Sequence, residues 1–86
     1  MMAEDVRAIL RTYIMDNFLM SDDDSVLEDG QSLLDTGVID STGVLELIQY
    51  LEETFEFAVE DEELVPENLD SVDNLVAFVG RKRQVA

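Results

Sequence analysis

The sequence predicts an all-α fold: a small bundle of three main helices plus one short helix, with a long loop between helices one and two. Two observations support this. Apolar residues make up 47% of the chain and recur at steps of three and four, the period of a helix with one buried face. No stretch alternates apolar and polar residues for the length of a strand, and Phe55-Glu56-Phe57 does so too briefly. The 86 residues suit a single domain over 1–86, and their apolar content excludes a disordered acidic chain.

The first helix is predicted over residues 3–18. Glu4 and Asp5 in its first turn suit the positive end of the helix dipole. An acidic run that begins at Ser21 ends the helical pattern. The apolar stripe of this helix consists of Val6, Ile9, Leu10, Tyr13, Ile14 and Phe18.

The loop that follows is longer than a usual connection, which points to function or to local structure. Its aspartates and Gly30 invite a calcium interpretation. Aligning Gly30 with the glycine of an EF-hand places Leu27 where an oxygen ligand is required, so the sequence excludes that motif. Residues 31–39 are expected to pack on the bundle through apolar anchors, namely Leu33, Leu34, Val38 and Ile39.

The second helix is predicted over residues 41–55, with Asp40 as its N-cap. Its buried stripe consists of Val44, Leu47, Ile48, Leu51 and Phe55. The opposite, solvent-facing side consists of Thr42, Glu46, Gln49 and Glu53. That side is either an ordinary hydrated helix face or a docking surface.

A second acidic cluster and two further helices complete the chain. The cluster, at 60–63, includes Asp61, Glu62 and Glu63. A short helical turn is predicted within 64–69, where Pro66 suits the first position. The last helix is predicted over 72–83, and its basic C-terminal end suits the dipole. Its core stripe consists of Val72, Leu75, Val76 and Val79.

The formal net charge is −16, from five basic and 21 acidic residues. No Lys or Arg lies between Thr12 and Gly80. Such a surface repels nucleic acid and anionic membranes and attracts partners with basic patches, although acidity can also serve solubility alone. No apolar run approaches the ~18 residues that span a bilayer, and the first residues do not resemble a signal peptide. We therefore expect a cytoplasmic protein, most simply a monomer.

The residue types present leave little room for catalysis by side chains alone. The sequence has no His and no Cys, so a serine lacks its usual base and zinc lacks its usual ligands. A glycosidase-type carboxylate pair needs a cleft that a bundle of this size hardly provides. The chain is therefore not expected to be an enzyme or to bind a metal, and any reactive group would come from a cofactor.

Asp-Ser pairs open two of the predicted helices, at Asp40-Ser41 and Asp70-Ser71. Both serve as N-caps in the simplest interpretation, and this is favoured for Ser71. Ser41 differs because it follows the apolar-anchored loop and precedes Gly43 in the first helical turn. Glycine costs about 1 kcal/mol against alanine in a helix. Either something approaches the backbone closely at Gly43, or the loop–helix junction requires a glycine. A helix N-terminus is also a good place to hold a phosphate.

The segment LDTGVIDSTG at 34–43, followed by VLELI at 44–48 and LEETF at 51–55, resembles the acyl carrier proteins. The order of the remaining elements follows the same pattern. The resemblance implies that a phosphopantetheinyl transferase esterifies 4′-phosphopantetheine to Ser41, with Asp40 and Thr42 beside it. The thiol of this arm would carry acyl or aminoacyl groups as thioesters, which fits a chain without cysteine.

Two departures from the fatty-acid carriers bear on cargo, and a comparison with the peptide-synthetase carriers adds a third observation. Thr42 and Gly43 stand where those carriers usually have leucine and an acidic residue, and the glycine is similar to the D-alanyl carrier proteins. Gln49 stands where they commonly expose an apolar docking residue. The Gly-Gly-His-Ser or Gly-Gly-Asp-Ser of peptide-synthetase carriers is absent. The resemblance therefore favours a discrete carrier that serves a dedicated ligase or a specialised pathway.

The implied partners are the transferase, an acyl- or aminoacyl-loading ligase, and downstream biosynthetic enzymes with basic docking patches. The surface that they would contact consists of Thr42, Glu46, Gln49 and Glu53, together with Asp61, Glu62 and Glu63. The rival hypothesis is an acidic helical adaptor that binds a basic protein without a prosthetic group.

Overall fold

The computed structural model describes residues 5–20 and 23–84. Within these residues the regular structure is entirely helical, which confirms the predicted all-α bundle. The α-helices are α1 (Val6–Ile14), α2 (Ser41–Phe55), α3 (Pro66–Leu69) and α4 (Val72–Gln84). A π-helical segment, Met15–Leu19, and two 3-10 turns, Asp24–Val26 and Asp61–Glu63, complete the regular structure.

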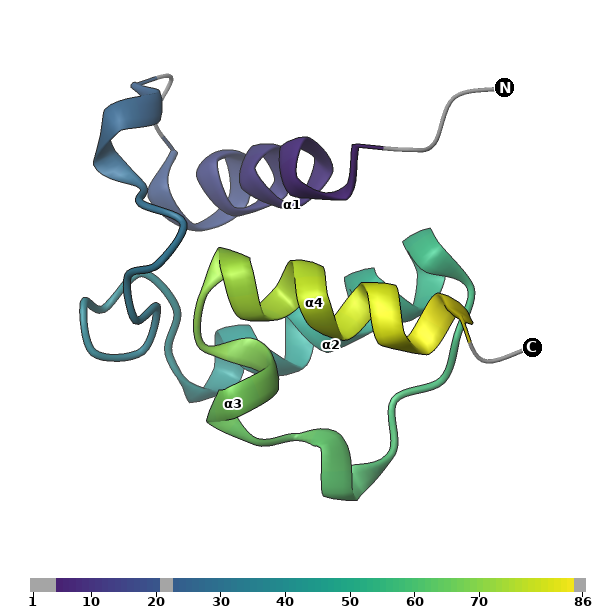
Figure 1. Ribbon diagram of the computed structural model, residues 1–86. Coiled ribbons are helices and arrows are strands. Elements are labelled where there is room, and N and C mark those ends of the chain that lie inside the picture. Colours follow the sequence, from purple (N-terminus) through teal and green to yellow (C-terminus); the bar gives the residue numbers. More distant parts are fainter. Residues whose placement is uncertain (1–4, 21–22, 85–86) are drawn as a thin grey trace.

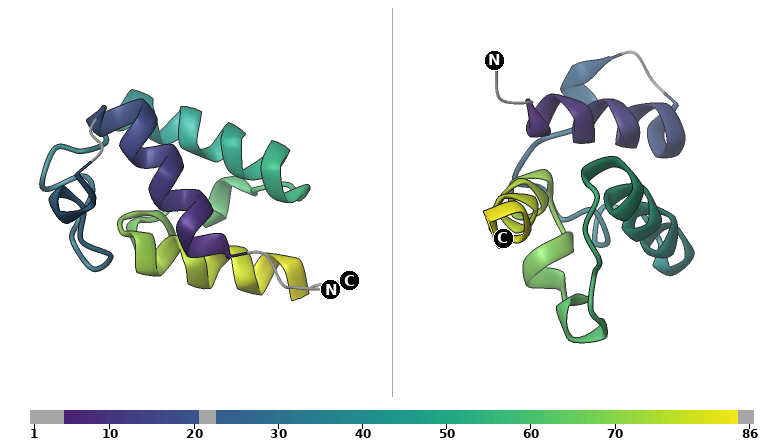
Figure 2. Two further views of the ribbon diagram at one scale, coloured as in Figure 1. Left: turned by 90° about the horizontal axis from the view of Figure 1, so that it is seen from above. Right: turned by 90° about the vertical axis from the view of Figure 1, so that its right-hand side faces the viewer.

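Helix α4 packs against each of the other three α-helices, and α2 lies beside it (Figure 1). α1 crosses over both helices on one side, and α3 packs against α4 on the other side (Figure 2). The long loop between α1 and α2 passes around one end of the bundle, next to the start of α2 (Figure 1). The first turn of α2 therefore lies where the loop and the helices converge.

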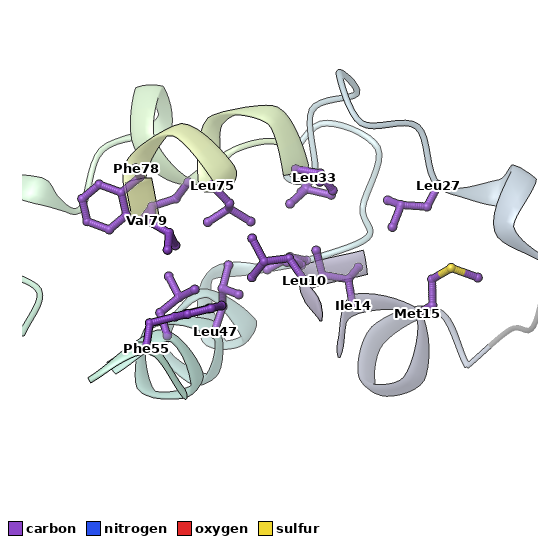
Figure 3. Close-up of a cluster of buried hydrophobic side chains, with 14 residues drawn as sticks. Leu10, Ile14, Met15, Leu27, Leu33, Leu47, Phe55, Leu75, Phe78 and Val79 are labelled. Atoms are coloured by element: carbon purple, nitrogen blue, oxygen red, sulfur yellow. The ribbon is translucent and has the colours of Figure 1, made fainter. Parts of the chain in front are cut away.

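The core is built mainly from α1, α2, α4 and the long loop, and the π-helical segment and α3 add Met15 and Leu69 (Figure 3). Leu33 and Ile39 are buried and Val38 packs half-buried against the core, so three of the predicted loop anchors are confirmed. The prediction was wrong for Leu34, whose side chain is 42% exposed. Phe78 of α4, which the predicted stripe left out, is the largest of the fully buried side chains.

The prediction for the first helix needs correction at its start. Residues 3 and 4 lie outside the described part of the chain. Asp5 does not belong to the first turn: it is the N-cap, and its Oδ1 accepts a hydrogen bond from the Ala8 amide at 3.1 Å. A carboxylate in this position satisfies a helix-end amide directly, and it also suits the dipole.

The end of the first helix also differs from the prediction. α-Helical bonding stops at Ile14, and the chain continues as a π-helix to Leu19. The Asn17 side-chain amide donates to the Tyr13 carbonyl at 2.9 Å, where it competes with the regular backbone bond four residues apart. A side chain inserted into the helical ladder widens it locally, which accounts for the change.

The other helices agree closely with the sequence. α2 has the predicted bounds and the predicted Asp40 cap, and α4 extends one residue beyond the predicted end. Pro66 occupies the start of α3 as predicted. The two 3-10 turns were not predicted, because three residues are too short to show a helical period.

The five basic side chains are engaged in contacts made by α1 and α4. Arg7 bridges Asp29 at 2.8 Å and Asp73 at 2.6 Å, and Arg11 binds Asp29 at 2.5 Å. In the last turn of α4, Lys82 pairs with Glu63 at 2.8 Å. Arg81 donates a hydrogen bond to the Asn68 side chain, and the Arg83 guanidinium lies over the Phe55 ring. α2 itself carries no basic residue.

Because Asp29 is ion-paired with Arg7 and Arg11, we expect part of the free energy of unfolding to depend on pH. Burial raises the pKa of Asp29, but the hydrogen bonds and charges of Arg11 and Arg7 outweigh it and hold that pKa below its ordinary value. The unfolded chain therefore binds this proton more readily than the folded chain. The contribution is full above the unfolded pKa, about 4, and is lost as the pH falls through the folded value.

We expect Asp29→Asn to lower the free energy of unfolding by about 1 kcal/mol at neutral pH, the scale of partly exposed charged contacts. The deficit should shrink as the pH falls below about 4. Urea denaturation of both proteins across this range measures it, with Asp35→Asn as an exposed control. A deficit that does not change with pH would contradict the ionic origin.

Candidate functional site

The first turn of α2 combines an exposed hydroxyl with unpaired backbone amides. The Asp40 carboxylate accepts a hydrogen bond from the Gly43 amide at 2.7 Å, and the Asp40 backbone carbonyl accepts one from the Val44 amide at 3.0 Å. The amides of Ser41 and Thr42 have no partner among the described residues, and the Ser41 side chain is exposed. These groups lie at the positive end of a 15-residue helix, which favours a phosphate attached to the hydroxyl.

The start of α4 carries the same dipeptide but is closed. Ser71 is only 6% exposed, and its Oγ accepts a hydrogen bond from the Asn74 amide at 3.0 Å. The Asp73 amide donates to the Asp29 carbonyl at 2.9 Å, so the long loop covers this helix end. The predicted capping role of Ser71 is confirmed.

A third Asp-Ser pair, Asp24-Ser25, lies in the long loop and opens none of the predicted helices. Ser25 is exposed, and its hydroxyl donates to the Asp23 carboxylate at 2.6 Å. It lies in a 3-10 turn of three residues, Asp24–Val26. Ser25 is thus accessible, but it lacks the dipole of a full α-helix that Ser41 has.

Gly43 is required by an internal contact. A Cβ atom at this position would lie 2.8 Å from Cε1 of Phe18 and 3.1 Å from Cγ2 of Ile39. The sequence interpretation of a close approach at Gly43 is therefore confirmed, and the approaching group is the Phe18 ring at the end of the π-helical segment. The first turn of α2 therefore packs closely against the Phe18 ring of the π-helical segment.

We expect Gly43→Ala to destabilise the protein by about 1 kcal/mol, because overpacking costs about 1–3 kcal/mol and the better helix propensity returns about 1 kcal/mol. In a Phe18→Ala background the same change should be neutral or stabilising. Chemical denaturation of the four proteins gives the coupling. Equal effects of Gly43→Ala in both backgrounds would refute the Phe18 contact as the reason for the glycine.

An apolar groove opens beside the start of α2. Its volume is about 190 Å³, and it lies between the end of the long loop, α2 and α3. Val44, which lines it, comes one helical turn after Ser41 and so faces a similar direction. Leu34 and Leu64, 42% and 40% exposed, also line it, which explains why two leucines face solvent here. The complete lining is Leu33, Leu34, Ile39, Val44, Leu64, Val65, Pro66 and Leu69.

The structure brings the predicted polar residues of α2 together on its exposed side. These residues are Thr42, Glu46, Gln49 and Glu53. Gln49 donates weakly to Glu53 at 3.4 Å. Glu46 lies on the flank toward α1, where burial and this carboxylate together raise the pKa of Tyr13.

Sequence reasoning missed one residue of this surface. Leu45 is 65% exposed and lies one turn after Ser41. Its position off the apolar stripe of α2 was the available signal, because a leucine there cannot reach the core. The exposed side of α2 therefore combines carboxylates with an apolar contact point.

The second acidic cluster divides into exposed and paired residues. Asp61 and Glu62 are exposed. Glu63 binds Lys82 and accepts a hydrogen bond from the Glu60 amide at 2.9 Å, and these two interactions hold the pKa of Glu63 below its ordinary value. The charge of Glu63 is thus largely balanced within the fold, whereas those of Asp61 and Glu62 face solvent.

A family model described as a phosphopantetheine attachment site matches residues 6–79 of the chain. The match extends from the start of α1 into α4 and includes all three Asp-Ser pairs. No curated protein shows a significant match to the chain. Among the described helices, none combines the length and the apolar character needed to cross a bilayer.

Proposed function

The chain belongs to the phosphopantetheine attachment-site family, and we propose that Ser41 is the residue that bears its arm. Members of this family carry 4′-phosphopantetheine covalently on a serine, so the protein is a phosphopantetheine-bearing carrier. The observation that supports Ser41 is its exposed hydroxyl beside the unpaired amides of Ser41 and Thr42. Ser71, by contrast, is buried and bonded as a cap.

The chemistry required of Ser41 is that of an acceptor. Its Oγ would bond to the phosphorus of the pantetheine phosphate as the pyrophosphate bond of coenzyme A breaks; adenosine 3′,5′-bisphosphate would leave, and the hydroxyl proton would pass to the transferase. A serine without a neighbouring base suffices, because the transferase supplies the activation. The helix N-terminus then stabilises the negative charge of the resulting phosphodiester, while Asp40 holds the first turn through the Gly43 amide.

The proposed cargo is an acyl or aminoacyl group held as a thioester on the arm. The groove next to Val44 favours an apolar group, because all of its lining residues are apolar. Its volume of about 190 Å³ lies below the ~300–1,000 Å³ of sites for larger ligands, so it suits a short apolar segment. Gly43 is explained by the Phe18 contact and gives no separate support for D-alanine as cargo.

The proposed partners are the transferase, a loading ligase and downstream enzymes with basic docking patches. α2 presents Glu46 and Glu53 without a basic residue of its own, and Leu45 adds an apolar contact. Asp61 and Glu62 extend the acidic surface. Such a face supports fast, reversible docking, as a monomeric cytoplasmic carrier that serves several enzymes requires. The chain acts here as a carrier, and its partners perform catalysis.

The proposal is tested by incubating the apo protein with coenzyme A, Mg²⁺ and a phosphopantetheinyl transferase, followed by intact mass measurement. We expect a gain of one phosphopantetheinyl group per chain. A chain that gains no mass with several such transferases would contradict the proposal and favour the acidic adaptor.

A further inference from the structure

The structure assigns to Asp70 the role of a positioning residue for the attachment site: it orients the end of the long loop, and through it the first turn of α2. This inference rests on the proposed function of Ser41. The Asp70 side chain accepts hydrogen bonds from the Ser32 hydroxyl at 2.6 Å and from the Leu34 amide at 2.9 Å. Its backbone carbonyl accepts from the Leu33 amide at 2.7 Å. One residue thus holds three consecutive residues of the loop.

Asp70 does not cap the helix beside which it lies. Ser71 performs that task for α4, through the Asn74 amide. The Asp70 carboxylate instead accepts hydrogen bonds from Leu34 and Ser32 of the long loop, 36 and 38 positions earlier in the chain. In this Asp-Ser pair, therefore, the serine caps the helix and the aspartate holds the loop.

The hydrogen bonds continue from Asp70 toward Ser41. The Ser32 Oγ accepts from the Asp35 amide at 3.0 Å, and the Leu33 carbonyl accepts from the Ile39 amide at 3.1 Å. Leu33 and Ile39 are buried and line the apolar groove. Ile39 comes two residues before Ser41 and packs close to Gly43. The orientation of the loop at Asp70 therefore determines how α2 begins.

A second attachment holds the other end of the same loop. Asp29 is bound by Arg7 and Arg11, and its carbonyl accepts from the Asp73 amide. This attachment does not involve Asp70. Removal of the Asp70 carboxylate should therefore loosen the part of the loop nearest Ser41, while the bundle stays folded. A small misplacement of a reacting group costs far more rate than stability.

The test compares Asp70→Ala with Ser71→Ala, the neighbouring substitution, which removes the α4 cap and leaves the loop contacts intact. For each apo variant, kcat and KM are measured with a phosphopantetheinyl transferase and coenzyme A, at a temperature where circular dichroism shows full folding. Hydrogen exchange at the Leu33 and Leu34 amides is measured on the same proteins.

We expect Asp70→Ala to lower kcat about tenfold, with little change in KM, because the exposed side of α2 is untouched. Exchange at Leu33 and Leu34 should become faster. Asp70→Asn, which keeps an acceptor for the Leu34 amide, should recover part of both effects. Ser71→Ala should have a kcat close to that of the wild type, and its Leu33 and Leu34 amides should exchange as slowly as in the wild type.

Wild-type kcat in Asp70→Ala, or equal losses in Asp70→Ala and Ser71→Ala, would overturn the inference. Unchanged exchange at Leu33 and Leu34 would overturn it as well. Failure of the proposed function looks different, because the wild-type chain itself would then gain no phosphopantetheine.

Discussion

Ser41→Ala is expected to abolish the transfer of phosphopantetheine to the protein, whereas Ser71→Ala and Ser25→Ala are expected to retain it. The substitution removes the oxygen that would bond to phosphorus, and no other serine among the described residues lies at an open α-helix start. Ser71 is buried under the long loop, and Ser25 lies in a 3-10 turn of three residues. Intact mass after incubation with transferase, coenzyme A and Mg²⁺ distinguishes complete modification from none.

The three serine variants separate the alternatives. A mass gain that survives Ser41→Ala but is lost in Ser71→Ala would place the arm at the start of α4. A mass gain that is lost only in Ser25→Ala would place the phosphopantetheine arm in the long loop. Thermal melts of each variant show whether a loss of modification follows from a loss of folding, which matters most for Ser71 because an N-cap is worth about 1 kcal/mol.

The second large effect concerns the acidic side of α2. Glu46→Gln/Glu53→Gln should raise the melting temperature while weakening the interaction with a basic partner. Mutual repulsion in a chain of net charge −16 opposes folding, so the loss of two negative charges relieves it. A gain of about 1 kcal/mol raises the melting temperature of a domain this size by roughly 4–8 °C. The transferase, in contrast, loses two attractive charges and should show a KM about tenfold higher at low salt.

The measurements are thermal melts and transferase KM as functions of NaCl concentration. The differences in melting temperature and in KM between variant and wild type should both shrink as the NaCl concentration rises, because the screening length falls to about 3 Å at 1 M. The wild-type melting temperature should itself rise with salt, and a flat response would contradict strong self-repulsion.

Asp16→Asn/Glu28→Gln is the matched control for this prediction. It removes two exposed charges away from α2, and neither side chain makes a hydrogen bond or ion pair within the described structure. It should stabilise the protein in a similar way but leave the KM unchanged. An equal rise of KM in both variants would show that the partner responds to total charge and not to this surface.

The helices that could be predicted from the sequence are those with strong local signals. α2 has a long apolar period, a capping aspartate before it and no competing side chain within its ladder, so its bounds followed directly. α1 ended early because the Asn17 side chain competes for the Tyr13 carbonyl, and propensity alone does not show this competition. Phe78 was missed because the predicted stripe of α4 had only four residues. The buried face of α4 is broader than that stripe and includes Phe78.

The site could be predicted only in part, because several of its contacts join distant segments. The Asp40 cap and the exposed polar side of α2 are local features. The reason for Gly43 lies in Phe18, on another helix, and the role of Asp70 lies in Ser32 and Leu34, on the long loop. No periodicity or composition links such pairs, so only the fold reveals them.

The apolar groove has a thermodynamic consequence for any group bound in it. Its walls come from the long loop, α2 and α3, so it exists only while these three segments are assembled. A ligand that binds the folded chain and not the unfolded chain adds its binding free energy to the free energy of unfolding. Cargo that enters the groove would therefore hold the bundle together, and its removal by a partner enzyme would return the carrier to a less stable fold.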